Sequence, residues 1–140
     1  MRILVLCTGN SARSQMAEGF LRSFDPQLEV FSAGTSPSSA VNPFAIRVMK
    51  EAGVDITGNV TKSVDRFMHQ SFDFVITVCD NARETCPVFT GRVRHRLHID
   101  FPDPAEVRGT DTQIEQAFRS VRDDIRDAFH ALYTRTLTEK

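Results

Sequence analysis

A cysteine and an arginine lie near the start of the chain with a short loop of small residues between them. The stretch Cys7-Thr8-Gly9-Asn10-Ser11-Ala12-Arg13-Ser14 comes after a run of β-formers and directly before a helical pattern. A loop that joins a strand to a helix directs backbone N–H groups at one point, at the positive end of the helix dipole. Arg13 adds a guanidinium that can hold two oxygen atoms at once. The spacing therefore predicts an oxyanion site with a nucleophilic thiol at its entrance.

The same surroundings are expected to favour the reactive, ionised form of Cys7. A cysteine has a pKa of about 8.5, and helix N-termini or nearby cations lower it to roughly 3.5–7.5. The loop amides would stabilise the thiolate, and a hydroxyl from Ser14 or Thr8 could donate to the sulfur. The loop is not a nucleotide-binding one, because it lacks both Gly-Lys-Ser/Thr and GxGxxG. A structural cysteine beside a surface arginine is the plain alternative, but it does not explain the position between a strand and a helix.

Two further cysteines, Cys79 and Cys86, bear on the fate of the Cys7 sulfur once it has attacked an oxyanion. Cys79 ends a predicted strand and, taken alone, fits an inert buried residue. Cys86 lies in a polar segment before Pro87 and is a poor core candidate. If residues 80–86 were helical, the two Cα atoms would lie about 10 Å apart, at ~1.5 Å per residue. Since a disulfide needs about 4.4–6.8 Å, pairing them would require the segment to unwind, as a thiol relay would.

Composition predicts one ordinary globular domain over residues 1–140. The 140 residues are 41% hydrophobic and 25% charged, which is enough to bury a sizeable core. The net charge is −1 and the charges are mixed along the chain, so we expect no nucleic-acid or membrane partner. The apolar run from Ile3 to Leu6 is too short for a signal peptide or a membrane span. We therefore expect a cytoplasmic protein, and nothing demands more than a monomer.

Cysteine and histidine usage gives no sign of a disulfide framework or a zinc site. Three cysteines are an odd number, and thiols stay reduced in the cytoplasm. The four histidines are scattered, and no CxxC or HxxxH spacing occurs. We therefore predict no bound metal, and we interpret His95 and His98 as ordinary strand residues.

Strand and helix patterns alternate along the chain and predict an α/β fold. Strands are expected at residues 3–6, 29–32, 72–78 and 93–99. The expected helices start after Arg13, at Asn42-Pro43 and at Thr110, with a short one near residues 64–69. This alternation indicates an α/β fold of three layers, with a four-stranded parallel sheet and helices on both faces. Ligands bind beyond the carboxyl ends of such strands, where Cys7, Cys79 and Asp103 are expected to meet.

The stretch from Cys7 to Glu18 resembles the loop and first helix of the low-molecular-weight phosphatase superfamily. More narrowly, it resembles the thioredoxin-coupled arsenate reductases. Further matching motifs occur in family order: Ser32-Ala33-Gly34, Asn42-Pro43, Thr77-Val78-Cys79, Cys86-Pro87 and Asp103-Pro104-Ala105. The resemblance implies a low-molecular-weight phosphatase-like fold with flavodoxin-like topology, and arsenate reduction for arsenic detoxification. It also implies no bound cofactor, and thioredoxin as the partner that supplies electrons. Whether a glutaredoxin-type reductant replaces thioredoxin is left open by the sequence.

The resemblance also implies a mechanism with three cysteines. Cys7 would attack arsenate, and Cys79 would then attack the Cys7 sulfur and release arsenite. Cys86 would resolve the resulting disulfide, and Arg13 would bind the oxyanion. Many relatives carry a second loop cysteine where this chain has Ala12, so Cys79 is expected to be the first resolving thiol.

Two more sets of residues take roles from the resemblance. Asp103 would be the general acid; Asp100, in the same loop, is the alternative that we consider weaker. Asn10, Ser14, Glu18 and Ser32 would support the loop, and three of these match side chains that bind potassium in some arsenate reductases. Lys62 falls where those enzymes have an aspartate, so we predict that it supplies its own cation and that potassium is not required.

The competing enzyme is a low-molecular-weight protein tyrosine phosphatase. It would hydrolyse phosphomonoesters through a phosphocysteine on Cys7, with Arg13 and Asp103, and would need neither other cysteine. Such enzymes usually have aromatic residues after the general acid, whereas here Asp103 is followed by Pro104-Ala105-Glu106. We therefore favour arsenate reduction with weak residual phosphatase activity. A non-enzymatic oxyanion-binding or redox-sensor module is a third interpretation.

Overall fold

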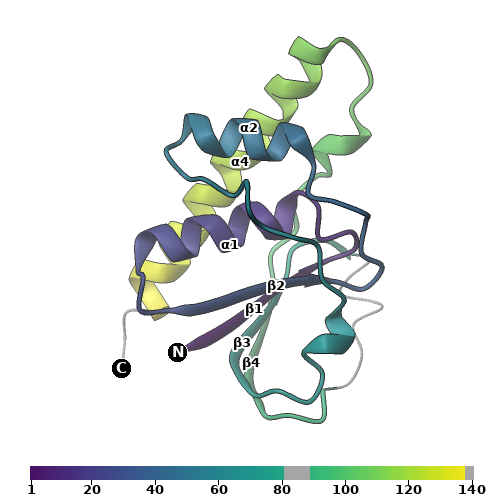
Figure 1. Ribbon diagram of the computed structural model, residues 1–140. Coiled ribbons are helices and arrows are strands. Elements are labelled where there is room, and N and C mark those ends of the chain that lie inside the picture. The colour runs from purple at the N-terminus through teal and green to yellow at the C-terminus, as the bar shows by residue number, and fades with distance from the viewer. Residues whose placement is uncertain (81–88, 138–140) are drawn as a thin grey trace.

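Four parallel strands form one sheet in a computed structural model that describes residues 1–80 and 89–137. The strands are β1 (Arg2–Cys7), β2 (Glu29–Gly34), β3 (Phe72–Thr77) and β4 (Val93–His98). Their order across the sheet is β2-β1-β3-β4, and all three neighbouring pairs run parallel (Figure 1). The predicted four-stranded parallel sheet and its flavodoxin-like order are therefore confirmed.

Three α-helices pack together above one face of the sheet (Figure 1). They are α1 (Arg13–Phe24), α2 (Pro43–Glu51) and α4 (Asp111–Leu132). α1 and α4 contact each other, and α2 packs on both of them. Three short helices complete the described residues: η1 (Val64–Arg66), η2 (Pro104–Glu106) and the π-helical η3 (Tyr133–Leu137). Within residues 1–80 and 89–137, no helix is both long and apolar enough to cross a membrane.

Aromatic side chains and η1 cover the opposite face. The ring of Phe67, just after η1, contacts those of Phe31 and Phe72, and Phe72 also contacts Phe89. Among the described residues η1 is the helix on this side of the sheet. A thiol relay is expected to require unwinding of the segment between Cys79 and Cys86. Residues 81–88 of this segment lie outside the described residues.

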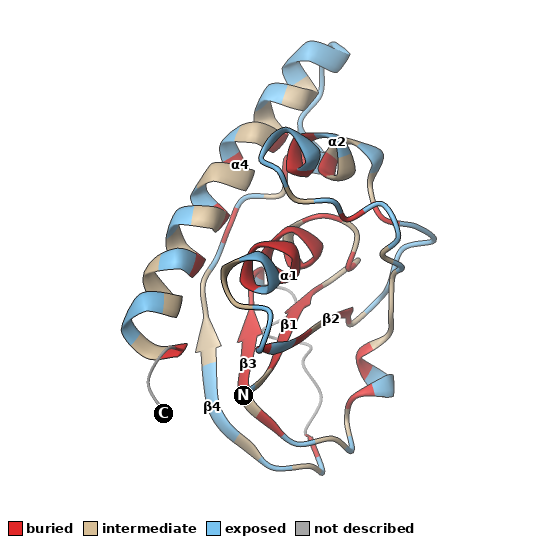
Figure 2. Cartoon of the chain, turned by 60° about the vertical axis from the view of Figure 1, so that its left-hand side comes forward, coloured by how far each residue is buried: buried red, intermediate tan, exposed pale blue. Residues whose placement is uncertain are grey.

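Burial depends on strand position in the sheet (Figure 2). β1 lies between two other strands, and Ile3 to Leu6 are fully buried, as a continuous apolar run requires. β4 lies at an edge and is largely exposed or half-buried, in keeping with its mixture of apolar and charged residues. The carboxyl end of β1 is thus held rigidly inside the protein, and Cys7 is its last residue.

The ends of α2 and α4 lie where the sequence has capping residues, whereas the start of α1 has no capping side chain. The side chain of Asn42 caps α2, and Thr110 with Gln113 forms the predicted capping box of α4. Gly53 lies just after α2 with φ +82°, a left-handed conformation that favours glycine. α1 begins after Ala12, which provides no side-chain cap. Its first amides therefore remain available for other partners.

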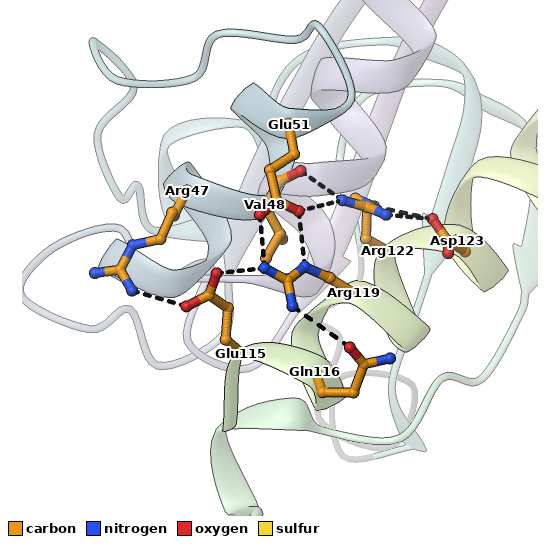
Figure 3. A network of polar contacts seen from close by, with 8 residues as sticks. All are labelled: Arg47, Val48, Glu51, Glu115, Gln116, Arg119, Arg122 and Asp123. Carbon is orange, nitrogen blue, oxygen red and sulfur yellow. Dashed lines mark hydrogen bonds and ion pairs between the residues drawn. The ribbon is translucent and has the colours of Figure 1, made fainter. Parts of the chain in front are cut away.

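Charged side chains join α2 to α4 in a network that Figure 3 shows from close by. Arg119 donates to both carboxylate oxygens of Glu51, at 2.9 and 2.8 Å, and also to Glu115 at 2.6 Å. Arg122 donates to Glu51 at 3.0 Å and to the carbonyl of Val48 at 2.9 Å. The hydrogen bond from Arg119, together with the attraction of both arginines, lowers the pKa of Glu51 to about 2.

This lowered pKa makes the stability of the α2–α4 contact depend on pH. Because the folded state holds the Glu51 carboxylate more strongly than the unfolded chain, the stabilisation is complete at neutral pH. It is lost as the pH falls from the ordinary pKa of 4.5 toward about 2. We expect Glu51→Gln to lower the thermal unfolding temperature slightly at pH 7, since exposed ion pairs contribute little. The difference from the unsubstituted protein should shrink in acid when measured by circular dichroism, and a constant difference would contradict this assignment.

Candidate active site

Cys7 lies at the carboxyl edge of the sheet, where the loop begins. Its side chain is 3% exposed. The Sγ atom lies 2.8 Å from Ser14 Oγ and accepts a hydrogen bond from the amide of Asn10 at 3.2 Å. The predicted interaction between the sulfur and a hydroxyl is therefore present, and Ser14 makes it. Thr8, the other candidate, lies beside a different thiol.

The loop turns its carbonyl groups outward. Each of the six carbonyl oxygens from Cys7 to Ala12 accepts a hydrogen bond from a donor further along the chain. In order, the donors are the amides of Thr35, Ser36 and Ser38, the side chain of Gln15, and the amides of Asn42 and Met16. Since peptide N–H and C=O groups point in opposite directions, the amides of this loop face its interior. This is the cradle that a tetrahedral oxyanion needs.

Asn10 holds the loop in this shape. Its backbone lies in the left-handed region with φ +51°, and its side chain is fully buried. The amide nitrogen donates to Ser14 Oγ at 2.8 Å and to Ser32 Oγ at 2.9 Å. The amide oxygen accepts from the backbone of Lys62 at 2.9 Å and from Gln15 Nε2 at 3.1 Å. The structure therefore brings Asn10, Ser14 and Ser32 together, as expected of residues that support the loop.

Sequence reasoning missed Gln15. Its side chain is fully buried and donates to the carbonyls of Asn10 and Val60, at 3.1 and 3.0 Å, while accepting from Asn59 at 3.0 Å. It therefore ties the loop to the segment before η1. The sequence feature that could have indicated this role is a long polar side chain next to the apolar stripe at the start of α1.

The expectation of a lowered pKa for Cys7 is wrong. Burial is the largest influence and raises the pKa of the Cys7 thiol above its ordinary value. Hydrogen bonds from the Ser14 side chain and from the amides of Ser14 and Asn10 oppose this rise, and the nearby Cys79 adds to it. The sequence shows the donors around the sulfur, whereas its exclusion from water depends on tertiary packing.

Ser14→Ala removes the strongest group that opposes this rise. We expect the alkylation rate of Cys7 by iodoacetamide at pH 7 to fall about tenfold, because the thiolate loses a hydrogen bond and such bonds to charged groups are worth about that much. The midpoint of the rate against pH should move to higher pH. Ser11→Ala, in the same loop, is the matched control and should leave the midpoint unchanged. A Ser14→Ala midpoint equal to that of the unsubstituted protein would contradict the role given to this hydroxyl.

Cys79 lies next to the loop because β3 pairs with β1. The amide of Val78 extends this pairing by donating to the carbonyl of Leu6 at 2.9 Å. Cys79 Sγ lies 3.4 Å from Thr8 Oγ1, and the thiol is buried. Cys7 and Cys79 are both free thiols. Cys86 lies outside the described residues, so its predicted role stays a prediction.

Arg13 connects the loop to the segment that carries Asp103. Its guanidinium donates to the carbonyl of Phe101 at 2.9 Å and lies 3.6 Å from the Asp103 carboxylate. That carboxylate also accepts the amide of Ala105 at 2.9 Å and so caps η2. The structure thus brings Asp103 to the oxyanion site beside Arg13. The weaker candidate, Asp100, instead groups with Asp80 and His98.

Glu18 and Lys62 occupy a second layer beneath the loop. Glu18 is buried, accepts from Asn59 at 3.3 Å and lies 3.7 Å from Arg22. Lys62 Nζ donates to the carbonyl of Val60 at 2.9 Å. Burial lowers the pKa of the Lys62 ammonium, while attraction to the Glu18 carboxylate opposes this shift. The Lys62 charge therefore attracts the Glu18 carboxylate, which also pairs with Arg22.

We accordingly expect that potassium does not stimulate turnover. Replacing sodium by potassium at constant ionic strength should change the steady-state rate of the enzyme by no more than about twofold. The reason is that the Lys62 ammonium already attracts the Glu18 carboxylate, the charge that a potassium ion would balance. Lys62→Met should lower the rate and create a response to potassium. Strong, saturable stimulation of the unsubstituted protein by potassium over sodium would contradict this prediction.

The site combines a cysteine at the end of a central parallel strand, a cradle of inward amides and an arginine. These features are typical of enzymes in which a thiol forms a covalent intermediate with a tetrahedral oxyanion. Residues 2–140 match the family model described as low molecular weight phosphotyrosine protein phosphatase, and the chain belongs to this family.

Relatives and solved structures agree with this membership. An arsenate reductase of Halalkalibacterium halodurans is 43% identical over 124 residues, which cover 88% of each chain. A solved arsenate reductase in the oxidized state has a TM-score of 0.77 and 29% identity, covering 96% of this chain and 97% of that one. A thioredoxin-dependent arsenate reductase of Corynebacterium glutamicum has a TM-score of 0.64 and 25% identity; the match covers 99% of this chain and 63% of that longer one.

Proposed function

We propose that this chain is a thioredoxin-coupled arsenate reductase that uses Cys7, Cys79 and Cys86 in turn. The observation that carries the proposal is the second buried free thiol beside the oxyanion cradle, with Cys79 Sγ 3.4 Å from Thr8 Oγ1. A phosphatase needs one thiol, whereas reduction of As(V) to As(III) needs two electrons and hence two thiols. The arsenate reductases among its relatives support the same conclusion.

In the first step the Cys7 thiolate binds arsenate covalently. The inward amides and Arg13 hold the arsenate oxygens, and a bond forms between Cys7 Sγ and arsenic. One oxygen leaves as water after it receives a proton, for which Asp103 is the donor. Since burial raises the pKa of Cys7, the hydrogen bonds from Ser14 and Asn10 are needed to stabilise the thiolate.

In the second step Cys79 reduces the arsenic. Its thiolate attacks Cys7 Sγ and forms the Cys7–Cys79 disulfide. The sulfur–arsenic bond breaks, and its electron pair stays on arsenic, which leaves as arsenite. Cys86 then attacks Cys79, which frees Cys7 and leaves a Cys79–Cys86 disulfide for thioredoxin to reduce. This cycle requires a reducing compartment such as the cytoplasm.

A coupled assay tests the proposal. Arsenate, thioredoxin, thioredoxin reductase and NADPH should give steady NADPH oxidation and an equal amount of arsenite. Cys7→Ser should abolish both, whereas Ser11→Ala should retain them. Brisk hydrolysis of p-nitrophenyl phosphate without arsenite formation would instead show that the protein is a phosphatase.

A further inference from the structure

A histidine and two aspartates come together beside Cys79, at the carboxyl ends of β3 and β4. One ligand atom from each of Asp80, His98 and Asp100 lies within 4.8 Å of the other two. His98 Nε2 donates a hydrogen bond to Asp80 Oδ1 at 2.9 Å. Asp80 and Asp100 are exposed, whereas His98 is half-buried at the end of β4. Residue 80 is far in sequence from residues 98 and 100, so no local spacing motif marks this group.

The imidazole of His98 is held from behind by Thr77, which is buried at the end of β3. Thr77 Oγ1 lies 2.8 Å from His98 Nδ1 and 3.5 Å from the carbonyl of Leu97. A hydroxyl both accepts and donates. With the Nε2 proton donated to Asp80, the Thr77 hydroxyl can donate to Nδ1. Were a metal to replace the Nε2 proton, Thr77 could instead accept an Nδ1 proton while donating to Leu97, which would leave the Nε2 lone pair for the ion. Histidines that bind metals are oriented through their other ring nitrogen in this way.

The distances and donor types suit a divalent transition ion. For bonds of about 2.1 Å, neighbouring ligands in an octahedral shell lie ~3.0 Å apart and in a tetrahedral shell ~3.4 Å apart. The 2.9 Å between His98 Nε2 and Asp80 Oδ1 is a hydrogen bond, and an ion that replaced its proton would find both atoms close to the spacing of such an edge. One imidazole and two carboxylates are typical ligands for zinc, manganese, iron or cobalt. Two carboxylate charges would also balance a 2+ ion.

We propose that Asp80, His98 and Asp100 form a binding site for a divalent transition-metal ion that, when occupied, slows the thiol relay. Metal binding at this site does not depend on the proposed function, whereas the effect of the metal on the thiol relay rests on the proposed function. Asp80 comes directly after Cys79, and a metal would fix it to His98 and Asp100 at the end of β4. In the relay Cys79 must exchange one sulfur partner, Cys7, for another, Cys86. Fixing the neighbouring backbone restricts that exchange.

Binding is tested in a protein without thiols, so that cysteine ligation plays no part. The Cys7→Ser/Cys79→Ser/Cys86→Ser variant is titrated with Co²⁺ and monitored by visible absorption and calorimetry. One ion per chain is expected. His98→Gln and Asp100→Asn should each weaken binding at least about tenfold, and Thr77→Val about 10–100-fold. His95→Gln is the matched control, because His95 stacks on Phe74 and takes no part in the cluster.

Three results would overturn the site: no cobalt bound, unchanged affinity in His98→Gln, or equal losses in His98→Gln and His95→Gln. Thr77→Ser keeps the hydroxyl and should restore the affinity lost in Thr77→Val; failure to do so contradicts the orienting role of Thr77.

The effect on the relay is tested with the three cysteines present. Saturating Mn²⁺, which has little preference for thiolates, should slow arsenite release in a single turnover at least about fivefold in the unsubstituted protein and leave His98→Gln unaffected. Binding without slowing contradicts the effect on Cys79. Absence of arsenite without any metal contradicts the proposed function instead and leaves the binding result intact.

Discussion

Replacing Cys79 by serine is expected to lower thioredoxin-coupled arsenate reduction by at least about 1,000-fold, as loss of a reacting nucleophile does. The reason is positional and chemical. β3 places Cys79 beside the Cys7 loop, with its sulfur 3.4 Å from Thr8 Oγ1. A serine hydroxyl can keep that contact, but it cannot form a disulfide or supply electrons to arsenic.

The oxyanion cradle should remain intact in Cys79→Ser, which separates the relay from the fold. Phosphate should protect Cys7 from alkylation to the same degree as in the unsubstituted protein, and p-nitrophenyl phosphate hydrolysis should persist. The pKa of Cys7 should fall somewhat, because the Cys79 thiol contributes to its rise. Full arsenate turnover in Cys79→Ser would contradict the assignment of Cys79 as the resolving thiol.

Arg13→Lys is expected to lower kcat/KM for arsenate by about 100–1,000-fold, the usual cost of removing an oxyanion-stabilising donor. The Arg13 guanidinium is held by the carbonyl of Phe101 at 2.9 Å and faces Asp103 at 3.6 Å. A planar fork can bind two arsenate oxygens while keeping one of these contacts, whereas an ammonium is a single point of charge.

The control is Arg126→Lys, which changes a half-buried arginine on α4 that pairs with Asp123 and Asp127. Its activity should equal that of the unsubstituted protein. Steady-state kinetics on both variants checks the expectation, and a thermal unfolding curve verifies folding. Equal activity of Arg13→Lys and Arg126→Lys would contradict the role of Arg13 in holding the oxyanion.

The fold was predictable because its signals are local. A continuous apolar run marked β1 as a central strand, and Asn42-Pro43 marked the start of α2. Thr110 with Gln113 marked the start of α4. The alternation of strands and helices then indicated parallel strands, whereas the strand order was implied by the resemblance. The arrangement of α2 beside α4 was not predictable, since it depends on side chains such as Glu51 and Arg119 that meet only in the folded chain.

Those parts of the site were predictable whose location depends only on residue type and on position along the chain. The positions of Cys7, Arg13 and Cys79 come from strand ends, because the carboxyl ends of parallel strands share one edge. The outward carbonyls depend on residues 35–42, and the raised pKa of Cys7 depends on burial. Neither leaves a local pattern. The cluster of Asp80, His98 and Asp100 leaves no local pattern either, since its residues come from two strand ends.

In the proposed reaction Cys7 and a second thiol supply both electrons to one arsenate. The most direct test is a single turnover of the fully reduced protein with excess arsenate and no other reductant, with arsenite then measured and the cysteine-containing peptides analysed by mass spectrometry. We predict one arsenite and one disulfide per chain, with neither formed in Cys7→Ser. Cleavage of a phosphomonoester by this protein, with all three thiols still reduced and no arsenite formed from arsenate, would contradict the proposed reaction.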